Sequence, residues 1–150
     1  MTRRDPTSST ETISLSIPSL PKYLRFVRCM IGEFAGLGGF APEECDRICL
    51  AVGEACSNII RHSYKEKPDG IISLKCFLHT DRIQISIRDF GEKIDLARIP
   101  ADSDCLQPGG LGVRMIKRMM DEVDYETTHD VGTEIHMTKY FQRPGSEDES

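Results

Sequence analysis

The 150-residue chain lacks the features of several protein classes. No apolar run approaches the ~20 residues that a membrane-spanning helix needs. Basic residues are interspersed with acids at a net charge of -5, so no basic stripe points to nucleic acid. The stretch MTRRDPTSSTET has two arginines but no apolar segment after them. We therefore expect no secretory signal and a cytoplasmic protein.

Zinc-binding spacings are also missing, although the chain has six cysteines. There is no CxxC pair and no cluster of histidine and cysteine at metal-ligand spacing. Five cysteines lie within apolar helical or strand patterns, namely Cys29, Cys45, Cys49, Cys56 and Cys76. The sixth, Cys105, falls in a loop. We expect buried, reduced thiols that pack as small hydrophobes, with no disulfide framework.

A chain of this length is most economically one domain. Residues 1–10 are polar and residues 143–150 are acidic, so we expect both to be tails around a domain of residues 11–142. An apolar share of 39% is ordinary for a globular chain and suffices for a two-layer core. No internal repeat is visible.

Apolar periodicity predicts eight elements between the tails. The strands are expected at residues 11–18, 71–79, 82–90, 123–130 and 132–141. The helices are expected within residues 19–40, with Ser19 as N-cap, and at residues 41–64 and 109–123. Because strands and helices do not alternate strictly, a Rossmann sheet does not fit. We predict an α+β two-layer sandwich, in which about three helices cover one face of a mostly antiparallel mixed sheet.

Glu54 and Asn58 lie one turn apart on a polar face of the second predicted helix. Taken alone, the pair is best read as a solvated helix face. Asparagine is nevertheless a mediocre helix former, and a polar ligand or metal would explain its position. An amide oxygen suits Mg²⁺, and a neighbouring carboxylate can serve as a general base.

Asp89 and Gly91 come at the end of a predicted strand, where D-x-G commonly begins a turn. A carboxylate at a strand end can also accept a hydrogen bond from an amino group such as that of adenine. The glycine beside it would permit close backbone approach. Thr133, after Gly132, is by itself an ordinary β-branched strand residue.

Residues 91–109 have no periodicity, and a stretch of this length is usually a lid or binding loop. The run GGLG at 109–112 then opens a helix. It is either a flexible loop or a phosphate cradle, because glycines let backbone N–H groups converge at a helix N-terminus. It is not a Walker loop, since no GK[ST] follows, nor a Rossmann fingerprint, since it follows a loop.

In this order, ExxxN, DxG, GGxG and GT resemble the N, G1, G2 and T boxes of the gyrase–Hsp90–histidine kinase–MutL ATP-binding fold. Within that superfamily the chain is most similar to the anti-sigma-factor serine/threonine kinases. The segments that carry the resemblance are AVGEACSNIIRHSY, IRDFGEKID, GGLGVRMIKRMMDEV and GTEIHMTK. The resemblance covers about residues 11–141.

The resemblance implies a Mg²⁺-ATP-dependent protein serine/threonine kinase that doubles as an anti-sigma factor. By position, it implies that Asn58 coordinates the Mg²⁺ that bridges the ATP phosphates. Glu54 would be the catalytic base that accepts the proton of the substrate hydroxyl. The substrate would be a serine or threonine on an anti-sigma-factor antagonist protein.

The same resemblance implies roles for the remaining boxes. Asp89 would bind the adenine amino group with the help of a water, and Gly91 would let the base approach. Residues 92–109 would form the ATP lid. The other implied contacts to ATP are Gly110 and Gly112 at the phosphates and Thr133 at the adenine pocket.

The chain departs from the family pattern at Lys93, which stands where the G1 box has its second glycine. The alternative is therefore an ATP-gated protein-binding module with little or no kinase activity. A third possibility is an interaction domain that binds no nucleotide. Family members bind a sigma factor or the antagonist, often as homodimers. We accordingly expect a homodimer, with no direct contact to nucleic acid or membrane.

Overall fold

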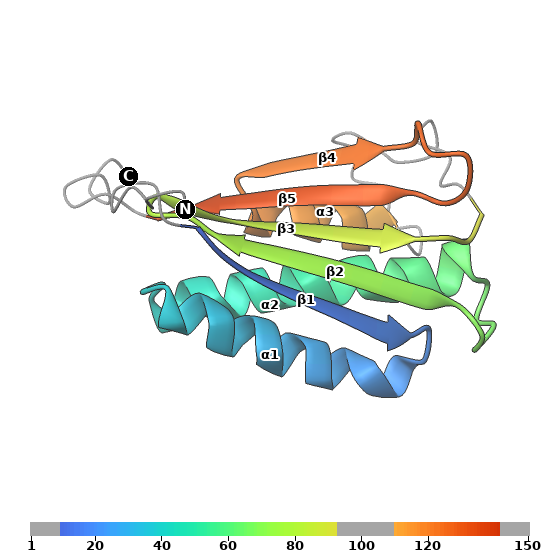
Figure 1. The fold of residues 1–150 in the computed structure, drawn as a ribbon, viewed down its shortest axis with the longest axis horizontal. Helices are drawn as coiled ribbons and strands as arrows, with labels where there is room; N and C mark the ends of the chain where they lie inside the picture. Colours follow the sequence, from blue (N-terminus) through green and yellow to red (C-terminus); the bar gives the residue numbers. More distant parts are fainter. Residues whose placement is uncertain (1–9, 93–109, 142–150) are drawn as a thin grey trace, which may run out of the picture.

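The computed structural model describes residues 10–92 and 110–141, without the side chains of residues 110–112. Five strands form one sheet in the order β1-β2-β3-β5-β4, and the helices lie together on one of its faces (Figure 1). Each pair of neighbouring strands is antiparallel. The predicted α+β two-layer fold is confirmed, and the sheet has no parallel pair among its described strands.

The elements follow the expected order. The strands are β1 (Glu11–Pro18), β2 (Ile71–Leu78), β3 (Arg82–Asp89), β4 (Glu122–Glu126) and β5 (Glu134–Tyr140). The helices are η1 (a 3₁₀ turn, Pro21–Tyr23), α1 (Leu24–Leu37), α2 (Pro42–Asn58), η2 (a π-helix, Ile59–Ser63) and α3 (Gly110–Met119). Within the described ranges, no helix combines the length and the apolar character that crossing a membrane requires.

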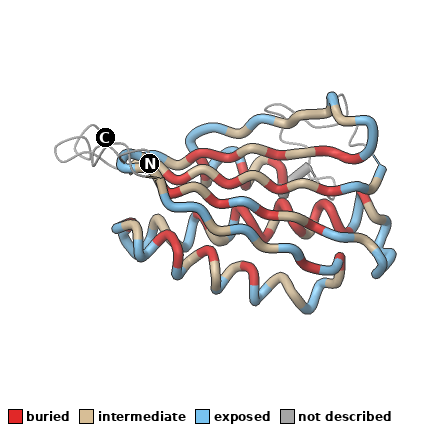
Figure 2. The backbone as a smooth tube through the Cα atoms, viewed as in Figure 1, coloured by how far each residue is buried: buried red, intermediate tan, exposed pale blue. Residues whose placement is uncertain are grey.

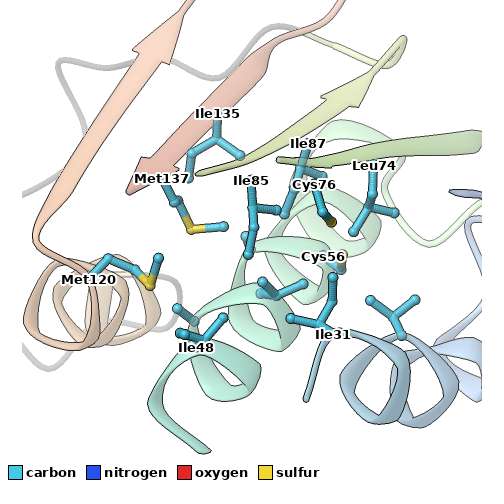
Figure 3. Packing of buried hydrophobic residues seen from close by; sticks show 14 of the residues in the cluster. Ile31, Ile48, Cys56, Leu74, Cys76, Ile85, Ile87, Met120, Ile135 and Met137 are labelled. Atoms are coloured by element: carbon cyan, nitrogen blue, oxygen red, sulfur yellow. The ribbon is translucent and has the colours of Figure 1, made fainter. Parts of the chain in front are cut away.

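The core lies between the sheet and α2, which packs against α1 on one side and α3 on the other. Buried positions alternate along the central strands (Figure 2), as expected for strands with one covered face. On β3, Ile83, Ile85 and Ile87 are all fully buried. Figure 3 shows Ile85 on the side of the sheet that faces Ile48 of α2. Each such side chain contributes roughly 1.5–3 kcal/mol on burial, so α2 is held firmly under the sheet.

Ser19 is not the N-cap that the sequence suggested. Its hydroxyl donates to the carbonyl of Lys67 (2.7 Å) and accepts from the N–H of Gly70 (3.0 Å). The helix begins later because Leu20 precedes a proline, which favours extended backbone, and Pro21 then opens the 3₁₀ turn. Ser19 is buried and ties the end of β1 to the turn before β2.

The cysteines of the described ranges are free thiols, as predicted. Cys56 and Cys76 are buried, and burial raises the pKa of each thiol to about 12. Neither therefore forms the reactive thiolate at neutral pH. Cys29 is exposed on α1, so the expectation of burial is wrong there. Cys105 lies outside the described residues.

Candidate functional site

Three segments meet at one end of the sheet. The end of α2, the end of β3 and the start of β5 lie at the same edge of the molecule (Figure 1). The backbone N–H of Asp89, at the end of β3, donates to the carbonyl of Thr133 at 3.0 Å. The backbone N–H of Glu92 donates to the carbonyl of Ser63 at 2.8 Å. Residues far apart in the sequence thus share one site.

Asp89 is the buried carboxylate of this site, only 1% exposed. Its Oδ1 accepts a hydrogen bond from the N–H of Gly91 at 3.0 Å. Burial raises its pKa, while this hydrogen bond, the nearby Ser63 hydroxyl and the charge of Arg88 offset part of the rise. A carboxylate can accept about four hydrogen bonds. Asp89 therefore keeps capacity to accept from a further donor.

Two glycines allow the backbone of these segments to come into contact. A Cβ at Gly91 would overlap the carbonyl oxygen of Ser63. A Cβ at Gly132 would overlap the carbonyl oxygen of Asp89, and Gly132 has a φ of +75°. Side chains other than glycine are strained in that region of φ. The close approach of the backbone around Asp89 thus requires glycine, which has no side chain, at both positions.

Gly132→Ala is expected to lower the free energy of unfolding by at least about 1–2 kcal/mol, the cost of left-handed backbone alone. The overlap with Asp89 adds to this cost. Gly36 of α1 is the matched control, because a Cβ there meets nothing within 4 Å. Alanine at Gly36 is expected to leave stability unchanged or raise it. Urea denaturation measures both variants, and equal midpoints for them would contradict the argument.

Glu54 and Asn58 lie one turn apart on α2, as the spacing predicted. Asn58 is the last residue of α2, and it is only 7% exposed. Its Oδ1 accepts a hydrogen bond from Nη2 of Arg61 at 3.2 Å. Glu54 is partly exposed, and within the described residues its carboxylate makes no hydrogen bond or ion pair. A solvated helix face thus does not describe Asn58, whereas Glu54 is partly exposed.

The helix does not continue to residue 64 as an α-helix, contrary to expectation. It changes at Ile59 into the π-helix η2, a rare form that is frequent at functional sites. The Tyr64 hydroxyl donates to the carbonyl of Ile71 (2.6 Å) and accepts from the N–H of Phe90 (2.8 Å). The end of the helix is in this way tied directly to the residue after Asp89.

Ser63, the last residue of η2, is a site residue that sequence reasoning missed. It is 3% exposed, and its Oγ is the buried side-chain polar atom that has no hydrogen-bond partner among the described residues. The sequence offers only a weak signal for it, a small polar residue five positions after Asn58 on the same helix.

The two predicted phosphate-binding glycines, Gly110 and Gly112, lie in the first turn of α3, which packs on α2. Thr133, the predicted adenine neighbour, is buried directly before β5. Most of the predicted lid at 92–109, Lys93 included, lies outside the described residues. The described part brings Asp89, Gly91 and Thr133 together.

Known proteins are similar to this chain in sequence and in architecture. Residues 17–139 match the family described as histidine kinase-like ATPase domain. This chain belongs to that family. The matched range of the histidine kinase-like ATPase domain spans every candidate site residue from Glu54 to Thr133.

Relatives place this histidine kinase-like ATPase domain in the RsbW-like branch. The serine-protein kinase RsbW of Bacillus pumilus (strain SAFR-032) is 31% identical over 144 residues, which cover 89% of this chain and 88% of the relative. The serine-protein kinase RsbW of Bacillus cereus (strain AH187) is 33% identical over 142 residues, with 89% and 87% covered.

Two solved structures share the fold. One is the crystal structure of the RsbU and RsbW domains of a Mycobacterium tuberculosis protein, with a TM-score of 0.65 and 17% identity over 89% of this chain and 33% of that chain. The other is the histidine kinase domain of a blue-light activated histidine kinase from Erythrobacter litoralis EL346, with a TM-score of 0.52 and 22% identity. That match covers 82% of this chain and 61% of the kinase chain. This histidine kinase-like ATPase domain thus spans less than two thirds of either solved chain.

Proposed function

We propose that this chain binds Mg²⁺-ATP and transfers the terminal phosphoryl group to a serine or threonine of an anti-sigma-factor antagonist protein. We also propose that the chain acts as an anti-sigma factor. The observation that carries the proposal is the buried Asp89 carboxylate, which retains acceptor capacity and lies against Thr133 and Gly91. Relatives named serine-protein kinase, which match along nearly their whole length, support the reaction class.

The chemistry of the site residues fits ATP and Mg²⁺. Asp89 only accepts hydrogen bonds when ionised, which suits the amino group of adenine. Asn58 offers a neutral oxygen, a ligand type that Mg²⁺ accepts. The buried Ser63 hydroxyl, without a partner in the described part of the chain, supports a polar ligand beside Asp89.

The remaining residues supply position and proton transfer. Glu54, one turn before Asn58 and partly exposed, would take the proton from the attacking hydroxyl as general base. The first turn of α3, with Gly110 and Gly112, has backbone N–H groups free of helical partners, and these favour phosphate. Bound Mg²⁺ would neutralise charge on the phosphates. Phosphoryl transfer requires mainly such positioning and charge neutralisation.

The proposal extends to partners and place of action. A sigma factor and a STAS-type antagonist would be the protein partners, and the chain would act in the cytoplasm as a homodimer. The relatives named RsbW and the solved structure of RsbU and RsbW domains support this assignment. A pull-down from the native host would identify both partners.

The direct test is a transfer assay. The purified chain is incubated with γ-labelled ATP, Mg²⁺ and the antagonist captured from the host, and label is expected on a serine or threonine of the antagonist. ATP binding without transfer would favour an ATP-gated binding module. Calorimetry that detects no Mg²⁺-ATP binding would refute the proposal.

Asn58→Ala is expected to weaken ATP binding about tenfold in Mg²⁺, equivalent to about 1.4 kcal/mol, and much less in EDTA. Loss of the hydrogen bond from Arg61 is expected to reduce stability by only about 1 kcal/mol. Titration calorimetry with and without Mg²⁺ measures the first effect and thermal melting the second. Asn58→Asp, which keeps an oxygen ligand, is the control. A variant that no longer folds would make Asn58 a structural residue.

A further inference from the structure

Histidine and glutamate side chains gather where β4 is joined to β5. Glu126 is the last residue of β4 and Glu134 is the first residue of β5, and the two residues are register partners. His129 lies in the connection between them. Its Nε2 is 2.7 Å from Oε2 of Glu126 and 3.0 Å from Oε1 of Glu134. The three side chains can thus each offer one ligand atom, and these atoms all lie within 4.8 Å of one another.

The charges at this point favour a bound cation. Like charges directly opposite each other on neighbouring strands are destabilising, and Glu126 and Glu134 are opposed in this way. A proton on His129 would balance only one of the two carboxylates. Arg88 is the register partner of Glu134 on β3, but its Nη1 donates to the carbonyl of Asp89 at 2.7 Å. A divalent cation would balance both carboxylates at once.

His136 adds an outer partner to this group. It comes two residues after Glu134 on β5, so both side chains lie on the face of the sheet opposite to Ile135, which Figure 3 shows in the core. The Nδ1 of His136 is hydrogen-bonded to Oγ of Ser86 at 2.9 Å, and its Nε2 is 3.6 Å from Oε1 of Glu126. The contact with Ser86 therefore holds the ring with Nε2 toward the carboxylate. Ligands of metals are commonly oriented by outer partners of this kind.

We infer that Glu126, His129 and Glu134 form a binding site for a divalent transition metal such as Zn²⁺, with His136 orienting Glu126. Imidazole nitrogens and carboxylate oxygens both bind Zn²⁺, at about 2.0–2.2 Å. Tetrahedral angles at such lengths place neighbouring ligand atoms about 3.3 Å apart. The separations of 2.7 and 3.0 Å at His129 would have to grow by about 0.3–0.6 Å. Partly exposed side chains can make this adjustment.

The ligand set distinguishes this metal from the Mg²⁺ that would accompany ATP. Mg²⁺ prefers oxygen ligands in octahedral geometry, whereas imidazole suits zinc, copper, iron and nickel. Three protein ligands leave one tetrahedral position for water. The bound metal would join the facing ends of β4 and β5. It would thereby hold the connection that carries Gly132 and Thr133, whose carbonyl accepts from the N–H of Asp89.

The test is calorimetric titration of Zn²⁺ into the nucleotide-free full chain, without an affinity tag and in excess Mg²⁺. We expect the wild type to bind one Zn²⁺ per chain. His136→Gln should weaken binding about 10- to 100-fold, the usual effect of losing an outer partner. His129→Gln should weaken it further, because a ligand is removed. His79→Gln, after β2 and thus at the opposite end of the sheet, is the matched control and should leave the affinity unchanged.

Thermal melting gives a second readout that needs no nucleotide. Zn²⁺ at 100 times its Kd should raise the melting temperature of the wild type by roughly 5–10 °C, and that of His129→Gln much less. Melting in EDTA shows whether the variant folds, and Glu134→Gln takes its place if it does not. Zn²⁺ bound by the folded variant as tightly as by the wild type would be held elsewhere. That result, or a wild type that binds no Zn²⁺, would overturn the inference.

Discussion

Glu54→Gln is expected to slow phosphoryl transfer by about 10²- to 10⁴-fold, the usual contribution of a general base. Glutamine has nearly the same shape as glutamate but cannot take the proton of the attacking hydroxyl. Since no described residue pairs with the Glu54 carboxylate, the substitution breaks no ion pair there. ATP affinity should change by less than about twofold, because the substitution removes an interaction that forms only in the transition state and not in the ATP complex. Single-turnover transfer and calorimetry measure the two quantities.

The control for Glu54→Gln is Glu33→Gln, at an exposed residue of α1 outside the site. It removes the same charge and should leave both transfer and binding unchanged. Normal transfer by Glu54→Gln would exclude Glu54 as the base. A large loss of ATP affinity would instead make Glu54 a ligand-binding residue.

Asp89→Asn is expected to weaken ATP binding by about 10- to 100-fold, because hydrogen bonds to charged groups contribute about 1.5–3 kcal/mol. The asparagine oxygen can still accept from the N–H of Gly91, so the local backbone should be preserved. Calorimetry with Mg²⁺-ATP measures the loss. ATP affinity that does not change would remove Asp89 from the proposed adenine site.

The same substitution should affect the stability of the nucleotide-free protein in the opposite direction. Burial raises the pKa of Asp89 above its ordinary 3.8, so the folded chain holds the proton more tightly than the unfolded chain. Ionised Asp89 therefore destabilises the folded chain. This destabilisation is absent at pH values below the pKa of Asp89 in the unfolded chain, and it is complete at pH values above the pKa of Asp89 in the folded chain. Asp89→Asn should therefore gain in melting temperature relative to wild type as pH rises from 3 to 7. A lower melting temperature than wild type at pH 7 would show that the charge stabilises the fold.

Four of the five strands could be predicted closely because their period of two is uninterrupted, whereas β4 ends at Glu126 and not at residue 130. The hairpin expected at 71–79 and 82–90 is observed as Ile71–Leu78 and Arg82–Asp89. Apolar residues at every second position of both strands leave one register that buries them all on the covered face. The helix positions followed from apolar spacing in the same way, which is why the architecture agrees so closely.

The change from α2 to the π-helix η2 could not be predicted, because over so few residues an α-helix and a π-helix bury nearly the same apolar residues. Ile59 and Ile60 satisfy either form, and only the shift of hydrogen bonds distinguishes them. Ser19 shows the same limit, since a serine before a helix is a good cap in isolation. Its actual partners, Lys67 and Gly70, are some fifty residues away in the sequence.

The site also contains residues that the sequence predicted and one that it did not. Order and spacing of the motifs pointed to Asp89, Gly91 and Thr133, and the antiparallel pairing of β3 with β5 brings them together. Ser63 was missed because a serine near a helix end has many uses. Its burial and its lack of a partner follow from three-dimensional packing against Gly91.

The strand order leaves β1 and β4 as the two margins of the sheet, where unpaired backbone groups could recruit a strand from another molecule. β4 has five residues, and Glu122, Asp124 and Glu126 are acidic, so a second β4 alongside would meet repulsion. β1 ends at Pro18, which has no N–H to offer a neighbour. The acidic side chains thus protect the β4 margin against addition of a second β4, whereas at β1 only the end of the strand is blocked, by Pro18.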